Sequence, residues 1–197
     1  MEIKFYSHAC FSISNKDTVL LNDPYLFGTA FNEGWDLIYE IKNFKFDINK
    51  KNFIYFSHEH PDHFSIQFLK SLNQDLRSKI TILYQKTRDG RVKSFINKFG
   101  FKFIELNDRK RYEFSDNFFI TIGQVPFYDS WALIETDNKK ILNANDCILE
   151  TPERVKDIKK VTNKVDILFT QYSYANWVEG GKDNKLERIK LANEKLS

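Results

Sequence analysis

The stretch Asn52-Phe53-Ile54-Tyr55-Phe56-Ser57-His58-Glu59-His60-Pro61-Asp62-His63-Phe64-Ser65 decides how the rest of the chain is organised. Residues 52–57 form an aromatic and β-branched run that is apolar on both faces and too short for a helix, which predicts a buried strand. From Ser65 onward the apolar residues recur at helical spacing, so a helix is expected next. The polar cluster between the two therefore lies at the carboxyl end of a strand and just before a helix.

This polar cluster is rich in side chains that bind metals. His58 and His60 are two residues apart, so in an extended backbone their imidazoles leave the same face. Pro61 cannot continue the strand and turns the chain, which brings Asp62 and His63 back beside them. Three of the chain's four histidines lie in the cluster. Because neutral imidazole and ionised carboxylate suit zinc and iron, the cluster predicts a metal site.

Length and composition limit the number of domains, the kinds of partner and the location that we expect. A chain of 197 residues without a Pro-, Gly- or Ser-rich linker is expected to form one domain over residues 1–197. With 30 basic and 27 acidic residues the net charge is only +3, so neither nucleic acid nor a membrane is an expected partner. The N-terminus lacks the apolar core of a signal peptide and the two cysteines need no disulfide, so we expect a cytoplasmic protein.

The pattern His-x-His-x-Asp-His, made by His58, His60, Asp62 and His63, resembles the metal-binding signature of the metallo-β-lactamase-fold superfamily. The resemblance implies a four-layer αββα sandwich of the α/β (α+β) class with two divalent metal ions. It implies that His58 and His60 hold metal one, whereas Asp62 and His63 hold metal two. It also makes Asp62 a catalytic residue that orients the attacking water.

The N-terminal region predicts a hairpin. The apolar segments Ile3–Ile13 and Thr18–Leu21 are joined by turn-forming residues. His8 is expected in the first strand, either as an ordinary strand histidine or as a catalytic residue near the metals. Asp23 ends the second strand before Pro24, where it either caps a turn or contacts substrate.

Two N-terminal segments narrow the resemblance. Ser7-His8-Ala9-Cys10, followed by Asp23-Pro24, is similar to the lactonase-like branch of the superfamily, which includes ascorbate-6-phosphate lactonase-like proteins, although the usual glycine is missing. Asp23 to Trp35 resembles the subgroup that contains the hydrolase-like domain of CMP-N-acetylneuraminate hydroxylase. The aromatic loop that ends at Trp35 is expected to wall the substrate pocket.

Strands and helices alternate in the remainder of the chain. Strands are expected at residues 79–85, 101–106, 118–123, 131–136, 141–144 and 165–170, and helices at residues 92–99, from Thr151, and at 185–196. The basic cluster at residues 107–111 predicts a solvated turn rather than a phosphate-binding loop. These elements would form two sheets that pack face to face, with the helices on the outer faces. Because the chain ends without a further strand, the domain is expected to be short at its C-terminus relative to the family.

Further site residues follow from the resemblance. It implies that Asp146, after an apolar strand, bridges the two metals, although a turn role stays open. Cys147 alternates to the opposite side and is expected to be structural. The family usually supplies one more histidine to each metal, but no histidine follows His63. Asp129 is the strong metal-binding group in the segment where the first is missing, so it is either the third ligand of metal one or a turn cap.

The predicted function follows from this site. Two cations that share a water lower its pKa to about neutral and supply a metal-bound hydroxide. We therefore expect a metal-dependent hydrolase that acts on an ester, lactone or phosphoester of a small sugar-like molecule, with Tyr172 and Trp177 as further substrate contacts. Zinc is the first expectation for the two ions, with iron or manganese as alternatives. An iron-dependent hydroxylase-like protein with a separate electron-transfer partner, or a non-catalytic metal-binding module, remains open.

Overall fold

β6 (Lys51–Tyr55) is the buried strand that the sequence predicts, and it lies inside a six-stranded sheet with the order β1-β2-β3-β6-β7-β8. The computed structural model describes residues 1–125, 129–149 and 151–171. The other strands of this sheet are β1 (Glu2–Ser7), β2 (Cys10–Ser14), β3 (Thr18–Asn22), β7 (Ile80–Gln85) and β8 (Lys102–Leu106). β3, β6, β7 and β8 are parallel, so their carboxyl ends meet at one edge of the sheet.

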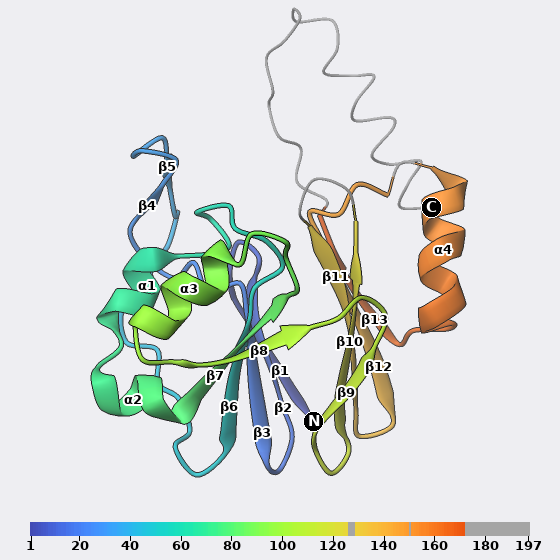
Figure 1. Ribbon diagram of the computed structural model, residues 1–197, viewed down its shortest axis with the longest axis horizontal. Coiled ribbons are helices and arrows are strands. Elements are labelled where there is room, and N and C mark those ends of the chain that lie inside the picture. Colours follow the sequence, from blue (N-terminus) through green and yellow to red (C-terminus); the bar gives the residue numbers. More distant parts are fainter. Residues whose placement is uncertain (126–128, 150, 172–197) are drawn as a thin grey trace, which may run out of the picture.

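The second sheet has five strands in the order β13-β12-β11-β10-β9. They are β9 (Arg111–Ser115), β10 (Phe118–Gln124), β11 (Ser130–Thr136), β12 (Lys139–Asn145) and β13 (Ile167–Thr170). All neighbours pair antiparallel except β12 and β13, which are parallel. A small hairpin of β4 (Thr29–Ala30) and β5 (Trp35–Asp36) stands apart from both sheets (Figure 1).

Three of the four helices in the described residues begin after a residue whose side chain caps the helix, and α3 (Arg91–Lys98) begins after Gly90 without such a bond. α1 (Ile66–Ser71) starts after Ser65, whose side chain accepts a hydrogen bond from the backbone N–H of Phe68. The others are α2 (Gln74–Lys79) and α4 (Pro152–Thr162). Thr151 caps α4 in the same way, with proline in its first turn.

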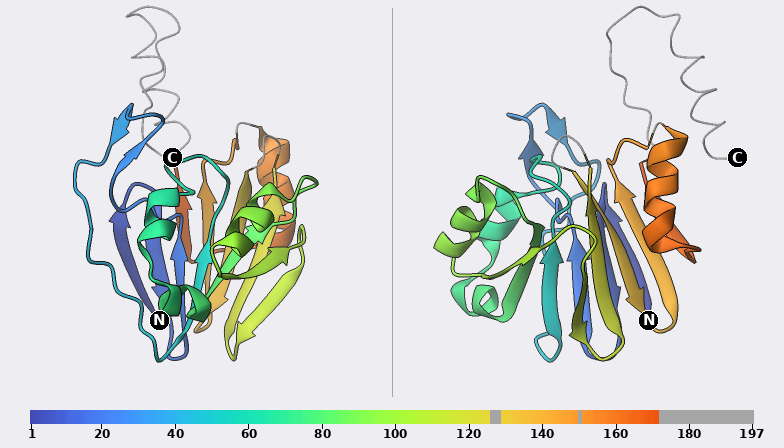
Figure 2. Two further views of the ribbon diagram at one scale, coloured as in Figure 1. Left: turned by 60° about the vertical axis from the view of Figure 1, so that its left-hand side comes forward. Right: turned by 45° about the vertical axis from the view of Figure 1, so that its right-hand side comes forward.

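The two sheets pack face to face between helices, which confirms the expected four-layer αββα sandwich (Figures 1 and 2). α1, α2 and α3 cover the outer face of the six-stranded sheet, and α4 covers the outer face of the other. Adjacent residues of one strand enter different layers, because side chains alternate across a strand. Leu20 packs between the sheets, whereas Leu21 packs against the helices.

The structure corrects three details of the expected elements. Ile3–Ile13 is not one strand, because the chain reverses at His8 and Ala9 between β1 and β2. β9 was not predicted, and Arg111, which was expected in a turn, is its first residue. The predicted loop before Trp35 contains the short strand β4. The helix expected at residues 185–196 lies outside the described residues.

Candidate metal centre

The carboxyl end of β6 carries the predicted metal cluster. The chain turns tightly after the strand, because the backbone N–H groups of His63 and Phe64 both donate to the carbonyl of His60, at 3.0 and 2.7 Å. The turn returns Asp62 and His63 to the side of His58, as the sequence predicts. His58, Asp62 and His63 are each at most 3% exposed, whereas His60 is exposed.

His58 and His60 present a pair of nitrogens to one point. Nε2 of His58 lies 2.9 Å from Nδ1 of His60. Two nitrogens that bind one metal at about 2.0–2.1 Å are themselves separated by about 2.9–3.4 Å. The pair thus fits the chelation of one ion, as expected for metal one.

A second group of ligand atoms lies around His63. Its Nε2 is 3.3 Å from Oδ2 of Asp146, which follows β12, and 3.7 Å from Oδ2 of Asp62. The same oxygen of Asp62 lies 2.9 Å from Nε2 of His8. Two sets of ligand atoms, each lying within 4.8 Å of one another, result: His8, Asp62 and His63, and His58, His63 and Asp146.

Two buried atoms of this group indicate a ligand between them. Among the described residues, Nε2 of His63 and Oδ1 of Asp62 have no hydrogen-bond partner. Buried polar atoms are almost always hydrogen-bonded, so each such exception needs an explanation. Imidazole nitrogen and carboxylate oxygen are donors that divalent transition metals accept, and the residues present therefore fit a metal centre.

His8 reaches the centre from a position that the sequence did not predict. It lies in the turn between β1 and β2 with a φ of 46°, not in the first strand. Residues other than glycine are uncommon at positive φ, and histidine is among the types that adopt it more readily, together with asparagine and aspartate. The turn directs the imidazole onto Asp62, so the reading of His8 as an ordinary strand histidine is wrong.

Asp23 is hydrogen-bonded to residues of the centre on the side away from the ligand atoms. It is therefore not placed to contact substrate, which was one of its two expected roles. Its carboxylate is fully buried and accepts hydrogen bonds from the backbone N–H and the Oγ of Ser57, both at 2.8 Å. Oδ2 also lies 3.0 Å from Nδ1 of His63. Because a carboxylate only accepts, Nδ1 of neutral His63 carries the proton and Nε2 keeps its lone pair for a metal.

Asp129 takes a similar supporting place beside His58. Its Oδ1 lies 2.8 Å from Nδ1 of His58, which is the nitrogen that faces away from His60. Asp129 belongs to neither set of clustered ligand atoms. Its Oδ1 is nevertheless buried without a hydrogen-bond partner among the described residues, so its role as the third ligand of metal one stays a prediction.

Ser57 is a site residue that sequence reasoning missed. Its Oγ lies 2.9 Å from Nδ1 of His58 and 3.4 Å from Nδ1 of His63, while it donates to Asp23. A single serine at a strand end carries no pattern by which it could have been found. It links the two supporting contacts into one buried network.

Asp146 and Cys147 diverge as expected. Asp146 follows Asn145, whose φ of 36° ends β12, and its carboxylate points to His63. Cys147 is buried in the apolar layer beneath α4, together with Trp131 and Ile158. Burial, followed by the nearby carboxylates, raises the pKa of the Cys147 thiol far above its ordinary value, so it stays protonated and structural.

The charges of the cluster are coupled. Burial alone would lower the pKa of His63, but the Asp23 and Asp146 carboxylates raise it well above its ordinary value. Burial would raise the pKa of Asp62 and of Asp146, yet their histidine partners, His8 and His63 respectively, lower both. The carboxylates thus favour a protonated His63, and metal binding at its Nε2 would displace that proton.

Aromatic rings of the β4–β5 hairpin stand over the histidines. Trp35 is 49% exposed, and its ring lies 6.0 Å from that of His8. Phe31 contacts both Trp35 and His60, with ring centroids 5.1 and 6.2 Å apart. This position suits the predicted substrate role of Trp35, which remains a prediction. Tyr172 and Trp177 lie outside the described residues.

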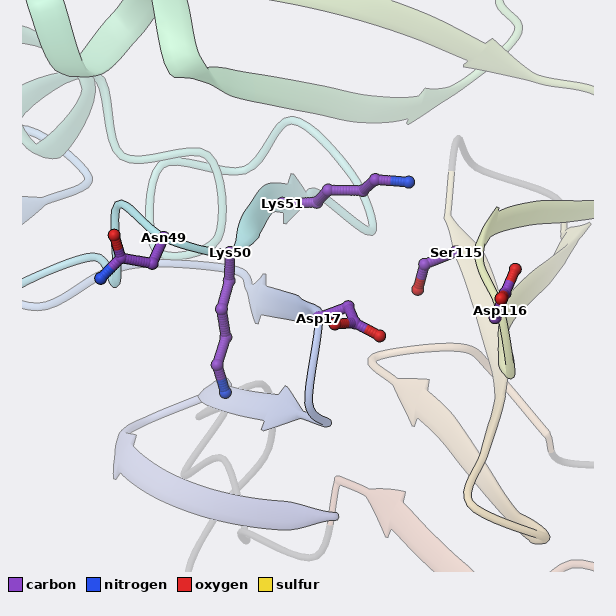
Figure 3. A pocket seen from close by; sticks show the side chains of 6 residues that line it. All are labelled: Asp17, Asn49, Lys50, Lys51, Ser115 and Asp116. Atoms are coloured by element: carbon purple, nitrogen blue, oxygen red, sulfur yellow. The ribbon is translucent and has the colours of Figure 1, made fainter.

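Two other features do not contribute to the centre. A polar cavity of about 490 Å³ lies at the opposite end of β6, where Lys50 and Lys51 donate to backbone carbonyls (Figure 3). The basic cluster at residues 107–111 forms ion pairs, with Arg109 on Asp157 and Arg111 on Glu135. Residues 107–110 form the predicted turn, whereas Arg111 begins β9. No helix of the described residues is long and apolar enough to cross a membrane.

The αββα sandwich with this cluster at one edge defines a protein of the metallo-β-lactamase fold. Residues 2–162 match the family model of the beta-lactamase superfamily domain, and the chain belongs to that superfamily. It is similar to the cytidine monophosphate-N-acetylneuraminic acid hydroxylase of Asterias rubens, with 30% identity over 158 residues. The match covers 75% of this chain but only 23% of that relative, so the chain spans about a quarter of its length.

Solved structures share the fold at low sequence identity. CmlA, a diiron beta-hydroxylase from Streptomyces venezuelae, superimposes with a TM-score of 0.64 and 17% identity, covering 84% of this chain and 33% of that one. An isothiocyanate hydrolase from Delia radicum gut bacteria also has a TM-score of 0.64, with 16% identity, covering 98% of this chain and 81% of that one. At these identities the likeness concerns the fold alone.

Proposed function

We propose that the protein is a metal-dependent hydrolase with a dinuclear centre. In this proposal His58 and His60 hold one ion, and His8, Asp62 and His63 hold the other. Asp146 clusters with His58, a ligand of the first ion, and with His63, a ligand of the second. In the proposal it bridges the ions, because a carboxylate with two oxygens can bind two cations and offset their repulsion. His8 then supplies an imidazole in a chain that has no histidine after His63.

The observation that carries the proposal is the pair of unpartnered buried atoms on His63 and Asp62. Both residues belong, with His8, to a group whose ligand atoms lie within 4.8 Å of one another. A cluster of this kind without a cation leaves like charges close together in a buried site, where their repulsion is poorly screened. Bound metal removes that repulsion and satisfies both atoms.

When bound, the two ions would supply an activated water and positive charge for a developing oxyanion. The chain's own residues orient the reactants. With one carboxylate oxygen on the ion, the other oxygen of Asp62 would accept a hydrogen bond from the water and orient it. Trp35 at the rim limits access by bulk water and offers an aromatic face to the substrate.

Metal content and hydrolysis test the proposal together. The purified protein is loaded with Zn²⁺, Mn²⁺ or Fe²⁺, freed from excess metal, and analysed for bound metal per chain. The loaded forms are then assayed with p-nitrophenyl acetate, δ-valerolactone, p-nitrophenyl phosphate and bis-p-nitrophenyl phosphate. Two ions per chain and hydrolysis that is lost in Asp146→Ala support the proposal. Two ions without hydrolysis of any of these compounds would point to oxidation or to a non-catalytic module.

An iron-dependent oxidation is the second candidate. It is favoured by the hydroxylase names of the similar proteins and by a ligand set with two carboxylates, Asp62 and Asp146, since oxygen ligands suit iron. The 197 residues contain two cysteines, too few for an iron–sulfur cluster with four thiolate ligands, so electrons would come from outside this sequence. Oxygen uptake by the iron-loaded protein with a chemical reductant is the corresponding test.

A further inference from the structure

A cavity of about 300 Å³ lies directly beside the proposed metal centre, in the described part of the chain. His8 and Asp146 form the side that faces the metals. The opposite sides come from strands of both sheets, with Phe5 and Phe11 on β1 and β2 and Phe169 on β13. Whatever occupies the cavity can therefore reach both proposed ions.

One wall of the cavity is aromatic. Phe11 is 2% exposed, and its ring is stacked on that of Phe169 with centroids 3.9 Å apart. Phe5 is paired with Phe11 across β1 and β2, and it is 63% exposed at the rim. A large exposed aromatic side chain next to a cavity offers an apolar surface to a ligand.

An unused hydrogen-bond donor lies beside Phe169 on the second sheet, since Asn143 and Phe169 are paired across β12 and β13. Asn143, on β12, lines the cavity and is only 2% exposed. Its Oδ1 accepts a hydrogen bond from the backbone N–H of Asn145, but its Nδ2 has no partner among the described residues. A buried amide group that lacks a partner costs free energy, and an acceptor oxygen of a ligand would satisfy it.

The described lining of the cavity offers no cationic side chain to a negative charge. None of the described residues that line it is lysine or arginine, and its one carboxylate is the proposed metal ligand Asp146. Phosphate groups in proteins are usually held by arginine, lysine or the N-terminus of a helix. An anionic group in this cavity would therefore be attracted only by the metal ions, at one end.

We propose that this cavity binds the non-reacting part of the substrate, and that this part is an uncharged group with an apolar face and a carbonyl or hydroxyl oxygen. Phe5, Phe11 and Phe169 contact the apolar face, and Nδ2 of Asn143 donates to the oxygen. The inference rests on the proposed function for the position of the metals. It favours neutral acyl esters and lactones over phosphoesters as the substrate class.

A binding experiment tests the cavity separately from catalysis. Hexanamide has an apolar chain and a neutral carbonyl, whereas hexyl phosphate has the same chain and a charged head. Binding of each to the metal-loaded protein is followed by NMR. We expect hexanamide to bind and to shift the resonances of Asn143 and Phe169. Asn143→Asp keeps the acceptor for Asn145 but replaces the donor with a charge, so its dissociation constant for hexanamide should rise at least fivefold.

Two further variants show whether weaker binding comes from a lost contact or from loss of the fold. Phe5→Ser lies at the exposed rim and should also weaken hexanamide binding, because it removes apolar contact. Asn97→Asp makes the same chemical change as Asn143→Asp at an exposed position on α3 and should leave binding unchanged. Absence of hexanamide binding, or equal binding by wild type, Asn143→Asp and Phe5→Ser, would overturn the proposed cavity.

Hydrolysis then decides the substrate class. We expect kcat/KM for p-nitrophenyl acetate or δ-valerolactone to exceed that for p-nitrophenyl phosphate at least tenfold, with Asn143→Asp raising KM at unchanged metal content. Faster hydrolysis of the phosphate ester would overturn the substrate class. If hexanamide binds in an Asn143-dependent way but no compound is hydrolysed, the cavity stands and the proposed hydrolase function fails.

Discussion

Replacing His8 is the sharpest test of the second metal position. His8 lies in a turn at positive φ, where asparagine is well tolerated, so His8→Asn keeps the backbone while removing the imidazole. Its Nε2 is 2.9 Å from Asp62, and its side chain is about one-third exposed, at 31%, so the fold should persist. We expect His8→Asn to bind one ion at the wild-type affinity and the other at least 100-fold more weakly.

The size of this effect follows from the ligand count. The proposed second site has three protein ligands besides water, namely His8, Asp62 and His63, apart from the shared Asp146. A 100-fold loss corresponds to about 2.8 kcal/mol of binding free energy. Removing a residue that only orients a metal ligand also lowers metal affinity about 10–100-fold. The magnitude alone therefore does not tell a ligand from a positioning residue.

A second substitution separates them. His8→Gln keeps an amide that can donate to Asp62 but supplies no strong metal ligand. If His8 is a ligand, His8→Gln should bind the second ion as weakly as His8→Asn does. The absorption spectrum of the Co²⁺-loaded protein should also change in both variants. Affinity is measured by competition with a chelating dye, and stoichiometry by elemental analysis. Restoration of two tightly bound ions in His8→Gln would refute the ligand role and leave His8 as a positioning residue.

Four further predictions follow from the centre. Asp23→Asn and Asp129→Asn should each lower metal affinity about 10–100-fold by chelator competition, because each carboxylate orients a ligand; unchanged affinity in Asp129→Asn would make that residue a turn cap. Asp146→Ala should lose metal, whereas Cys147→Ser should keep both ions and cost about 1–3 kcal/mol of unfolding free energy through its buried hydroxyl; equal loss of metal would indicate a thiolate ligand. Metal at 100 times its dissociation constant should stabilise the fold by about 2.7 kcal/mol and raise Tm by about 5–10 °C relative to chelator-treated protein, and identical melting curves would argue against specific binding. Burial raises the pKa of the Cys10 and Cys147 thiols, so at pH 8 a thiol reagent should label them slowly in the native protein and quickly after denaturation; rapid native labelling would contradict this burial.

The sequence predicts the metal cluster and most of the sandwich for a shared physical reason. The strands at residues 51–55, 80–85 and 130–136 are dense apolar runs, and such runs are stable only in a core that they help to form. The histidines after β6 converge because the turn that joins them is local. Both signals depend on neighbours in sequence and can be read without the rest of the fold.

The supporting contacts could not be predicted in the same way. Asp23 meets Ser57 and His63 only because β3 lies beside β6 in the sheet. His8 was placed in a strand because its neighbours are apolar, and nothing local marks the reversal of the chain there. β9 was missed because Arg111 and Glu113 interrupt an otherwise modest apolar pattern. In each case tertiary packing decides where the side chain goes.

The proposed ligands are spread widely along the chain, from the first turn at His8 to the end of β12 at Asp146, and this has a consequence during synthesis. A growing chain presents the histidine cluster early, while the bridging carboxylate is still inside the ribosome. Domains fold as units as they emerge, so the early cluster can hold at most a provisional ion. If Asp146 bridges the ions as proposed, the complete dinuclear site forms only after the second sheet has been made and has docked.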